Sequence, residues 1–339
     1  MENDFRERDE RKLHMLYSIF NNLKPEWLTF LGILFAFCAT CFALAKWSKY
    51  LPKDLGRDFA HNGKLSAGKP RGAGFVFIII FVIASVLFGV YKNEFLIYAI
   101  LVAAAMMTGF LDDCSRMPWG EYKKGLLDFI IAVMIAITFL NFNSSTVEIV
   151  SLGMNLALHP FVFAVLTVIL VWASINVTNC TDGVDGLSAT LTIITLGTIY
   201  GINQIKGINA DFNYIILIFI VCLLGYLWFN ATPSKLMMGD AGSRAMGLFI
   251  SIAILKTNSP FLYIPVALVL ILDGGLGLVK VALLRFCKIR ILTNVRTPLH
   301  DQVRKVMGWS NTQAVFRFAI IQAMIGLAVL YLVSMYYPF

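Results

Sequence analysis

The sequence contains ten runs of apolar residues joined by polar connections, and this arrangement restricts the fold more than any other feature. The runs are continuous rather than alternating, which excludes a large outer-membrane β-barrel. At ~20 apolar residues for each bilayer crossing, ten crossings would use roughly 200 of the 339 residues. Only 14% of the residues are charged, whereas a soluble domain carries ~25%. A soluble enzyme and a disordered chain are therefore excluded, and the sequence predicts an all-α polytopic membrane protein with about ten transmembrane helices, near residues 26–47, 73–91, 95–111, 125–143, 160–177, 184–202, 213–229, 244–257, 260–284 and 314–337.

The distribution of lysine and arginine predicts how these helices are oriented. One set of connections contains 16 of the 28 basic residues, and the alternate set contains only Lys92, Lys206 and Lys256. Basic connections tend to stay on the cytoplasmic side of a membrane. We therefore expect the first set to be cytoplasmic and, with ten spans, both termini to be external. The basic set comprises residues 48–72, 112–124, 178–183, 230–243 and 285–313.

We expect one integral membrane domain over residues 1–339, because the sequence shows no internal repeat and no low-complexity linker. Its parts are an N-terminal segment (1–25), a transmembrane bundle (26–337) and a long cytoplasmic loop (285–313). Residues 144–159 alternate polar and apolar side chains around Gly153, a pattern typical of a β-hairpin. A small external hairpin is therefore expected there.

Acidic residues gather at the predicted cytoplasmic ends of the helices. The third run ends in Asp112 and Asp113, at a helix C-terminus, where the helix dipole disfavours anions. The two adjacent carboxylates also repel each other. One interpretation is a polar membrane boundary with water nearby. The other is that a metal ion or a basic partner compensates the two charges.

Two further acidic motifs lie just before predicted helices. The connection after the fifth run reads NCTDGVDGL, in which Asp182 and Asp185 are each followed by glycine. Glycine lets backbone N–H groups approach a ligand closely, and a helix N-terminus attracts anions. The connection after the seventh run reads MMGDAGS and contains Asp240. Turns rich in Asn, Asp and Gly occur wherever a chain reverses, but so many polar groups between apolar runs favour a ligand site.

Ionisable residues elsewhere add to this candidate site. Asp273 and Lys280 lie two helical turns apart inside the ninth run, where ionisable side chains are costly and favour a functional role. We expect both to face a wet interior. His300 lies in the last basic loop, opposite the acidic motifs, and Lys69 lies in a glycine-containing segment of the first loop that suits contact with phosphate.

The expected cytoplasmic face thus presents several carboxylates among lysines, arginines and a histidine. Carboxylates hold Mg²⁺ while a substrate phosphate completes the coordination shell. Basic side chains hold the remaining phosphate oxygens. The sequence therefore predicts metal-assisted chemistry on a diphosphate at the membrane surface. The carboxylates are those of Asp112, Asp113, Asp182, Asp185 and Asp240.

The order of these motifs resembles the polyprenyl-phosphate N-acetylhexosamine-1-phosphate transferase superfamily. LDD, NCTDGVDGL, MMGDAGS and a late His-containing loop followed by GWS and RF occur in that order over roughly residues 60–320. Gly308-Trp309-Ser310 and Arg317-Phe318 favour the phospho-N-acetylmuramoyl-pentapeptide transferase branch over sister enzymes that use UDP-N-acetylglucosamine. The ten-helix fold, external termini and cytoplasmic active site of this family agree with the predicted topology.

This resemblance implies a reaction and its partners. The phosphate of undecaprenyl phosphate attacks the sugar-linked phosphate of UDP-N-acetylmuramoyl-pentapeptide (UDP-MurNAc-pentapeptide), giving lipid I and UMP, with Mg²⁺ as cofactor. The resemblance also implies peptidoglycan synthesis at the bacterial inner (plasma) membrane, inhibition by nucleoside antibiotics, a homodimer and no nucleic-acid partner.

The resemblance further implies roles for individual residues. Asp112 resembles the acid proposed to deprotonate the lipid phosphate, Asp113 would support the phosphate or metal site, and Asp240 resembles a Mg²⁺ ligand. His300 matches the first histidine of a three-histidine motif. The expected catalytic residues are therefore Asp112, Asp113, Asp240 and His300, and the expected metal ligands are Asp113 and Asp240. The expected substrate-binding residues are Lys69, Lys124, Asn179, Asp182, Gly183, Val184, Asp185, Asn230 and Met237.

The chain departs from the family pattern at three places. Asp301 and Gln302 stand where the family has its second and third histidines, so no role is carried over to these positions. Lys280 replaces a glutamine common in the ninth span, and KPRGAG replaces a TPTMGG-like segment.

Two other functions stay open at this point. A sister transferase would move another N-acetylhexosamine phosphate, such as GlcNAc-1-phosphate, onto polyprenyl phosphate. A membrane transporter or channel would use the acidic residues for gating. Transporters often show repeats around a site in the middle of the membrane, whereas the acids here gather at one face.

Overall fold

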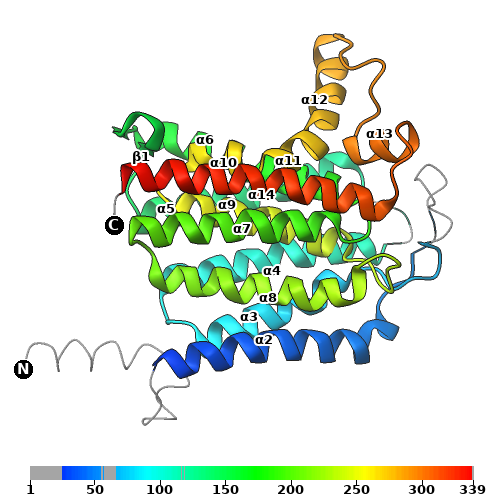
Figure 1. The fold of residues 1–339 in the computed structure, drawn as a ribbon, viewed down its shortest axis with the longest axis horizontal. Helices are drawn as coiled ribbons and strands as arrows, with labels where there is room; N and C mark the ends of the chain where they lie inside the picture. Colours follow the sequence, from blue (N-terminus) through cyan, green and yellow to red (C-terminus); the bar gives the residue numbers. More distant parts are fainter. Residues whose placement is uncertain (1–24, 55, 57–65, 116, 118, 338–339) are drawn as a thin grey trace, which may run out of the picture.

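The computed structural model describes residues 25–54, 56, 66–115, 117 and 119–337. Each of the ten apolar runs forms helix, and most of these helices lie side by side in one elongated bundle (Figure 1). The expected N-terminal segment lies almost wholly outside the described residues. The long helices are α2 (Pro25–Trp47), α3 (Ala73–Phe88), α4 (Asn93–Asp113), α5 (Glu121–Phe142), α6 (Pro160–Thr181), α7 (Leu187–Lys206), α8 (Ala210–Asn230), α9 (Gly239–Lys256) and α14 (Asn311–Tyr336).

Six of the described helices are long and apolar enough to cross a membrane, and a seventh is added if the bent ninth segment is one span. This agrees with a polytopic membrane protein. The α3 helix is short, with 16 residues, and α7 and α9 contain more polar residues. Ten crossings, external termini and a cytoplasmic active site therefore stay predictions.

The ninth apolar run is a broken helix. It begins with η4 (Pro260–Leu262), α10 (Tyr263–Val266) and α11 (Leu268–Leu270), and it continues as η5 (Ile271–Gly275), α12 (Leu276–Ala282) and η6 (Leu283–Cys287). The two parts are bent by 70° at the break after α10. Figure 1 shows α12 projecting from the bundle, close to α13 (Leu299–Lys305). The η5 segment is a π-helical turn, a form often found at functional sites.

The hairpin expected around Gly153 is confirmed. Strand β1 (Thr146–Ile149) pairs antiparallel with β2 (Met154–Ala157) through the short helix η3 (Val150–Leu152). Gly153 has a φ of 59°, which glycine adopts without steric cost. In Figure 1, β1 lies beside the C-terminal end of α14 and α13 lies at the opposite end of the bundle. These two connections, assigned to different sides of the membrane from charge, are thus well separated.

The α9 helix lies at the centre of the bundle, and 17 of its 18 residues are buried. It packs against α3, α4 and α6. A Cβ atom at Gly109 of α4 would lie 2.3 Å from the Asp240 carbonyl oxygen, and one at Gly74 of α3 would lie 2.0 Å from the Gly242 nitrogen. Glycine therefore allows α3 and α4 to approach the end of α9 that contains Asp240.

The other end of α9 contains a buried ion pair. Lys256 Nζ lies 3.0 and 3.1 Å from the two carboxylate oxygens of Glu94 and 2.9 Å from Asn143 Oδ1. Tyr98 donates a further hydrogen bond to Glu94. Full pairing and hydrogen bonding make such buried charges tolerable, so this group ties α4, α5 and α9 together at the end far from Asp240.

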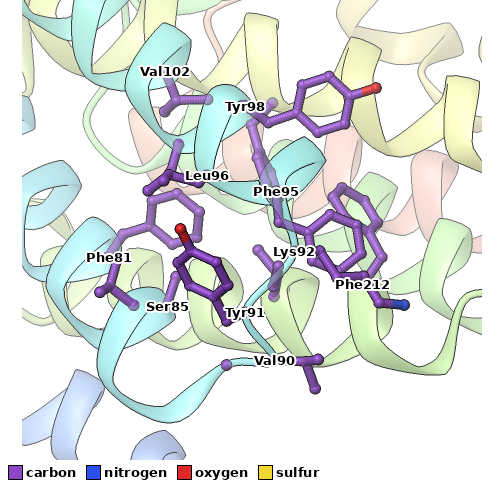
Figure 2. Close-up of a pocket in the computed structure, with 15 residues that line it drawn as sticks. Phe81, Ser85, Val90, Tyr91, Lys92, Phe95, Leu96, Tyr98, Val102 and Phe212 are labelled. Carbon is purple, nitrogen blue, oxygen red and sulfur yellow. The ribbon is translucent and has the colours of Figure 1, made fainter. Parts of the chain in front are cut away.

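An apolar pocket lies beside this ion pair, at the turn between α3 and α4 (Figure 2). Figure 2 shows aromatic side chains of Phe81, Phe95 and Phe212 around it, with Tyr91 and Lys92 on the connecting turn. None of the expected site residues lines this pocket. The candidate site therefore lies elsewhere.

Candidate active site

Three of the expected catalytic carboxylates meet at the N-terminal end of α9. Asp112 and Asp113 end α4, and Asp240 lies in the first turn of α9. Lys124, in the first turn of α5, lies between two of them, because its Nζ is 2.5 Å from Asp112 Oδ2 and 2.9 Å from Asp240 Oδ2. The expectation that a basic partner or a metal compensates the LDD charges is confirmed for the basic partner. We call Arg71, Asp112, Asp113, Lys124 and Asp240 the carboxylate cluster.

Asp113 holds the N-terminus of α9 in place. Its Oδ1 accepts a hydrogen bond from the Asp240 N–H and its Oδ2 one from the Ala241 N–H, each at 3.1 Å. The positive end of a helix dipole stabilises a carboxylate in this position. The Asp113 side chain has no exposed surface, and Arg71 Nε lies 2.8 Å from Oδ1. Asp113 thereby fixes the backbone from which Asp240 projects.

Arg71 was not among the expected site residues, although it contacts two of them. Besides Asp113, it reaches Asp240 Oδ1 at 3.4 Å and Asp54 Oδ1 at 3.8 Å. Burial acts to lower the pKa of Arg71, but the carboxylates of Asp113, Asp240 and Asp54 together raise it by more, so the guanidinium stays charged. The sequence signal for Arg71 was its position in the glycine-rich segment 69–74. This segment also contains Lys69, and the sequence alone does not show which of the two contacts the carboxylates.

The charges of this group do not balance. Four carboxylates, counting Asp54, surround two cations, which leaves a formal charge of −2. In the part of the chain that the structure describes, no three His, Cys, Asp or Glu side chains are grouped as a complete metal site. Mg²⁺ does not need one, because it is commonly held by one or two carboxylates, waters and substrate phosphates. The carboxylate oxygens and the excess negative charge therefore fit a magnesium site whose coordination is completed by substrate.

The NCTDGVDGL turn forms a second polar group. Asp182 Oδ1 accepts a hydrogen bond from Ser188 Oγ at 2.7 Å. Asp185 Oδ2 accepts one from the Ser234 N–H at 3.3 Å and lies 4.0 Å from Lys69 Nζ. Lys69 also donates to Ser234 Oγ at 3.0 Å. Because Lys69 is two residues from Arg71, the first loop links this turn to the carboxylate cluster.

The two expected asparagines make internal hydrogen bonds. Asn230 is 4% exposed, and its amide accepts from the Gly186 N–H and donates to the Leu236 carbonyl, each at 2.8 Å. Asn179 donates to Ser243 Oγ at 2.8 Å. Their contacts therefore join the NCTDGVDGL turn to the connection before α9 and to α9 itself.

Val184 and Met237 are fixed by burial and by backbone hydrogen bonds. Val184 is buried within the turn. Met237 forms backbone hydrogen bonds in both directions, donating to the Pro70 carbonyl at 2.8 Å and accepting from the Ala73 N–H at 3.0 Å. The connection before α9 is thus paired with the loop that supplies Lys69 and Arg71.

His300 is held by Asp273. Asp273 Oδ2 lies 2.8 Å from His300 Nδ1, and Oδ1 accepts the His300 N–H at 2.6 Å. The expectation that Asp273 faces a wet interior is wrong, because its side chain has no exposed surface and both oxygens have protein partners. Lys280 instead donates to the carbonyls of Leu292 and Val295, each at 2.9 Å, and so supports the loop before α13.

The other ring nitrogen of His300 faces the NCTDGVDGL turn. A Cβ atom at Gly183 would lie 2.3 Å from His300 Nε2, so only glycine leaves room for this approach. Arg304 donates to the Gly183 carbonyl at 3.3 Å and to Asp301 Oδ1 at 2.8 Å. Asp301 therefore has an ion-pair role where the family has a histidine, and α13 is docked on the turn.

Gly239→Ala is expected to disturb the carboxylate cluster. Gly239 has a φ of +69°, and a Cβ atom there would lie 2.1 Å from Asp113 Oδ2. We expect a loss of about 1–3 kcal/mol in unfolding free energy, measured as a lower Tm of the purified protein. Gly207→Ala is the control, because its φ of +64° gives similar backbone strain with nothing within 4 Å. Equal losses for the two variants would contradict a clash with Asp113.

Comparisons with known proteins relate this arrangement to a transferase family. The family model for glycosyl transferase family 4 matches residues 95–258. A phospho-N-acetylmuramoyl-pentapeptide-transferase of Treponema pallidum (strain Nichols) is 38% identical over 340 residues, covering 94% of this chain and 93% of the relative. Enzymes of the same name are 26% identical in Helicobacter pylori (strain Shi470), covering 93% and 97%, and 25% identical in a Nitratiruptor species, covering 91% and 96%.

Proposed function

The chain belongs to the phospho-N-acetylmuramoyl-pentapeptide-transferase family, and we propose that it transfers phospho-N-acetylmuramoyl-pentapeptide from its UDP-linked donor to undecaprenyl phosphate, forming lipid I and UMP. The observation that supports this most strongly is the 38% identity to the Treponema pallidum relative over 94% of the chain. The six apolar described helices agree with an enzyme of peptidoglycan synthesis that works in a membrane. A bacterial inner-membrane location, a homodimer and inhibition by nucleoside antibiotics belong to the same proposal.

Phosphate chemistry is assigned to the carboxylate cluster. Asp112 would accept the proton of the lipid phosphate, and Lys124 is close enough to balance the charge of Asp112 before the transfer. Arg71 and Lys124 would bind phosphate oxygens, since charge-assisted hydrogen bonds from basic side chains suit that task. The cluster thus combines a base with two anion-binding cations.

Mg²⁺ is the proposed cofactor, and Asp240 is its proposed ligand. When bound, Mg²⁺ would neutralise the charge of the donor diphosphate. Asp113 stays a proposed second ligand, although its oxygens already accept two backbone hydrogen bonds and contact Arg71. Its contacts support a role in holding Asp240 at the start of α9.

The donor nucleotide is assigned to the NCTDGVDGL turn and the segments around it. Uridine would bind at Asn179, Asp182, Gly183, Val184 and Asp185, with Asn230 and Met237 supporting the pocket. Lys69 lies between Asp185 and the first loop and would contact the diphosphate. His300 Nε2, facing Gly183, would contact the donor from α13.

Release of UMP by the purified protein tests this function. The assay contains undecaprenyl phosphate, Mg²⁺ and either UDP-MurNAc-pentapeptide or UDP-N-acetylglucosamine. We expect UMP only with the first donor, and we expect a chelator to stop its release. UMP from the second donor alone would favour a sister transferase, and no UMP from either would favour a transporter.

Asp273→Asn is expected to lower kcat by about 10- to 100-fold, by analogy with the loss seen when the hydrogen-bond partner that orients a metal-bound histidine is changed. An aspartate that accepts from Nδ1–H leaves Nε2 unprotonated in neutral imidazole, whereas an amide group at this position can favour the other tautomer. The ¹⁵N chemical shifts of His300 would report the tautomer directly.

Lys280→Met is the matched control, because Lys280 lies in the same broken helix but binds only loop carbonyls among the contacts described above. It should keep the imidazole shifts of the parent enzyme. An Asp273→Asn enzyme with unchanged kcat and unchanged shifts would refute the orienting role.

A further inference from the structure

A second charged pair lies one helical turn further along α5 and α9 than the Lys124–Asp240 pair. Asp128 is four residues after Lys124 in α5, and Arg244 is four residues after Asp240 in α9, so each lies on the same side of its helix as the earlier residue. Arg244 Nη2 is 2.5 Å from Asp128 Oδ1. This inner pair is more deeply buried than the outer one, with side chains only 5% and 1% exposed.

The two pairs have opposite polarity. In the outer pair the cation, Lys124, is on α5, and in the inner pair the cation, Arg244, is on α9. Each charged side chain therefore faces an opposite charge on the neighbouring helix. A second opposite charge lies one turn away on its own helix, and both attractions are favourable. Sliding α5 by one turn along α9 would place Lys124 opposite Arg244. The alternation thus opposes a shift in the relative position of the two helices.

Arg244 also contacts the backbone that holds Lys124. Its Nη2 donates to the Lys124 carbonyl at 3.3 Å. The α5 helix packs chiefly on α4 and α6, so long side chains provide its connection to α9. Arg244 and Asp128 are paired with each other one turn further along the helices than Lys124 and Asp240, so we assign them to positioning rather than to the reaction itself.

We propose that Arg244 and Asp128 are positioning residues for the transfer reaction. Their buried ion pair sets the position of α5 along α9 and so holds Lys124 between Asp112 and Asp240. This inference rests on the proposed function of the carboxylate cluster, and it explains the positions of the side chains in that cluster by an ion pair one helical turn away from it.

The double variant Asp128→Leu/Arg244→Met tests the proposal. Removing both charges avoids the large penalty of leaving one buried charge unpaired. We expect the variant to fold, with kcat for UMP release lowered by about 10- to 100-fold, because displacements of about 1 Å at a reacting centre have effects of this size. The KM for the UDP-linked donor should change by less than about three-fold, since the donor-binding turn is untouched.

Glu94→Leu/Lys256→Met is the matched control. It removes a different buried ion pair of α9, at the end far from the cluster, and it should lower Tm without lowering kcat. The proposal is overturned if the folded Asp128→Leu/Arg244→Met enzyme keeps the parental kcat, or if the control loses kcat to the same extent.

Asp128→Asn keeps the proposal testable if the double variant does not fold. Asparagine retains an oxygen that can accept from Arg244 but leaves the buried guanidinium without its counter-charge, so Tm should fall together with kcat while the donor KM stays unchanged. A parental kcat in this variant would count against the proposal.

Hydrogen exchange separates this inference from the proposed function. Backbone amides in the first turns of α5 should exchange faster in Asp128→Leu/Arg244→Met than in the parent, and the Glu94→Leu/Lys256→Met control should not show this change. The exchange result stands even if the parent protein releases no UMP, and unchanged exchange would overturn the positioning role by itself.

Discussion

Asp240→Asn should reduce UMP release by about 10³-fold. Asp240 Oδ2 lies 2.9 Å from Lys124 Nζ and Oδ1 lies 3.4 Å from Arg71. An amide removes the charge that draws in both cations and the proposed metal, and it can turn an NH₂ group toward one of the cations. Loss of one preorganised electrostatic group commonly costs ~10²–10³ in rate, and weaker metal binding adds to that loss.

The measurement is kcat at saturating donor, with Mg²⁺ titrated over a wide range. Asp211→Asn is the matched control, because Asp211 also pairs with a lysine, Lys92 at 2.6 Å, but is 40% exposed and lies at the other end of the bundle. The control should keep the parental rate and the same Mg²⁺ requirement. Activity of Asp240→Asn close to that of the control would overturn the assignment of Asp240.

Asp112→Asn should reduce turnover by about 10²–10⁴-fold, the range for a lost general base, while the donor still binds. Asp112 Oδ1 accepts the Trp119 N–H at 2.7 Å, and Oδ2 lies 2.5 Å from Lys124 Nζ. Asparagine can keep the first contact through its carbonyl oxygen, but it cannot accept a proton from the lipid phosphate. The fold and the donor-binding turn should therefore survive the change.

Two measurements on the same protein test this prediction, namely single-turnover UMP release and equilibrium binding of the UDP-linked donor. Asp113→Asn provides a contrast, because Asp113 accepts the hydrogen bonds at the start of α9. That variant should lose thermal stability as well as rate, whereas Asp112→Asn should lose rate alone. A donor affinity that falls as far as the rate in Asp112→Asn would refute the assignment of Asp112 as the base.

The helices were predictable because each apolar run is continuous over at least three helical turns. Their ends followed from the same polar connections that contain the site residues. The break in the ninth run was not predicted, although Pro265 lies in α10 just before it. Proline removes a backbone hydrogen-bond donor and clashes with the preceding helical turn. The position of Pro265 was therefore the sequence signal that could have predicted the break.

The acidic members of the site were predictable because carboxylates are conspicuous between apolar runs. Lys124 and Lys69 were expected as well, but Arg71 was not, because Arg71 and Lys69 are equivalent by composition and only the folded chain shows that Arg71 pairs with Asp113 and Asp240. Asp128 and Arg244 lie far apart in sequence, and nothing in either local pattern shows that they meet. Asp273 was correctly singled out as a costly charge, but its burial against His300 depends on how α13 docks.

The central position of α9 has a consequence for how the protein is made. An arginine at the middle of an isolated helix costs about 2.5–3.5 kcal/mol to insert into lipid, and α9 contains both Arg244 and Lys256, while all of its apolar residues are buried inside the bundle. Contact with lipid would therefore stabilise α9 little, whereas α4 and α6 pack closely against it. We therefore expect α9 to join the bundle late during biogenesis, after its neighbours are in place, so that the carboxylate cluster forms only when those helices have assembled.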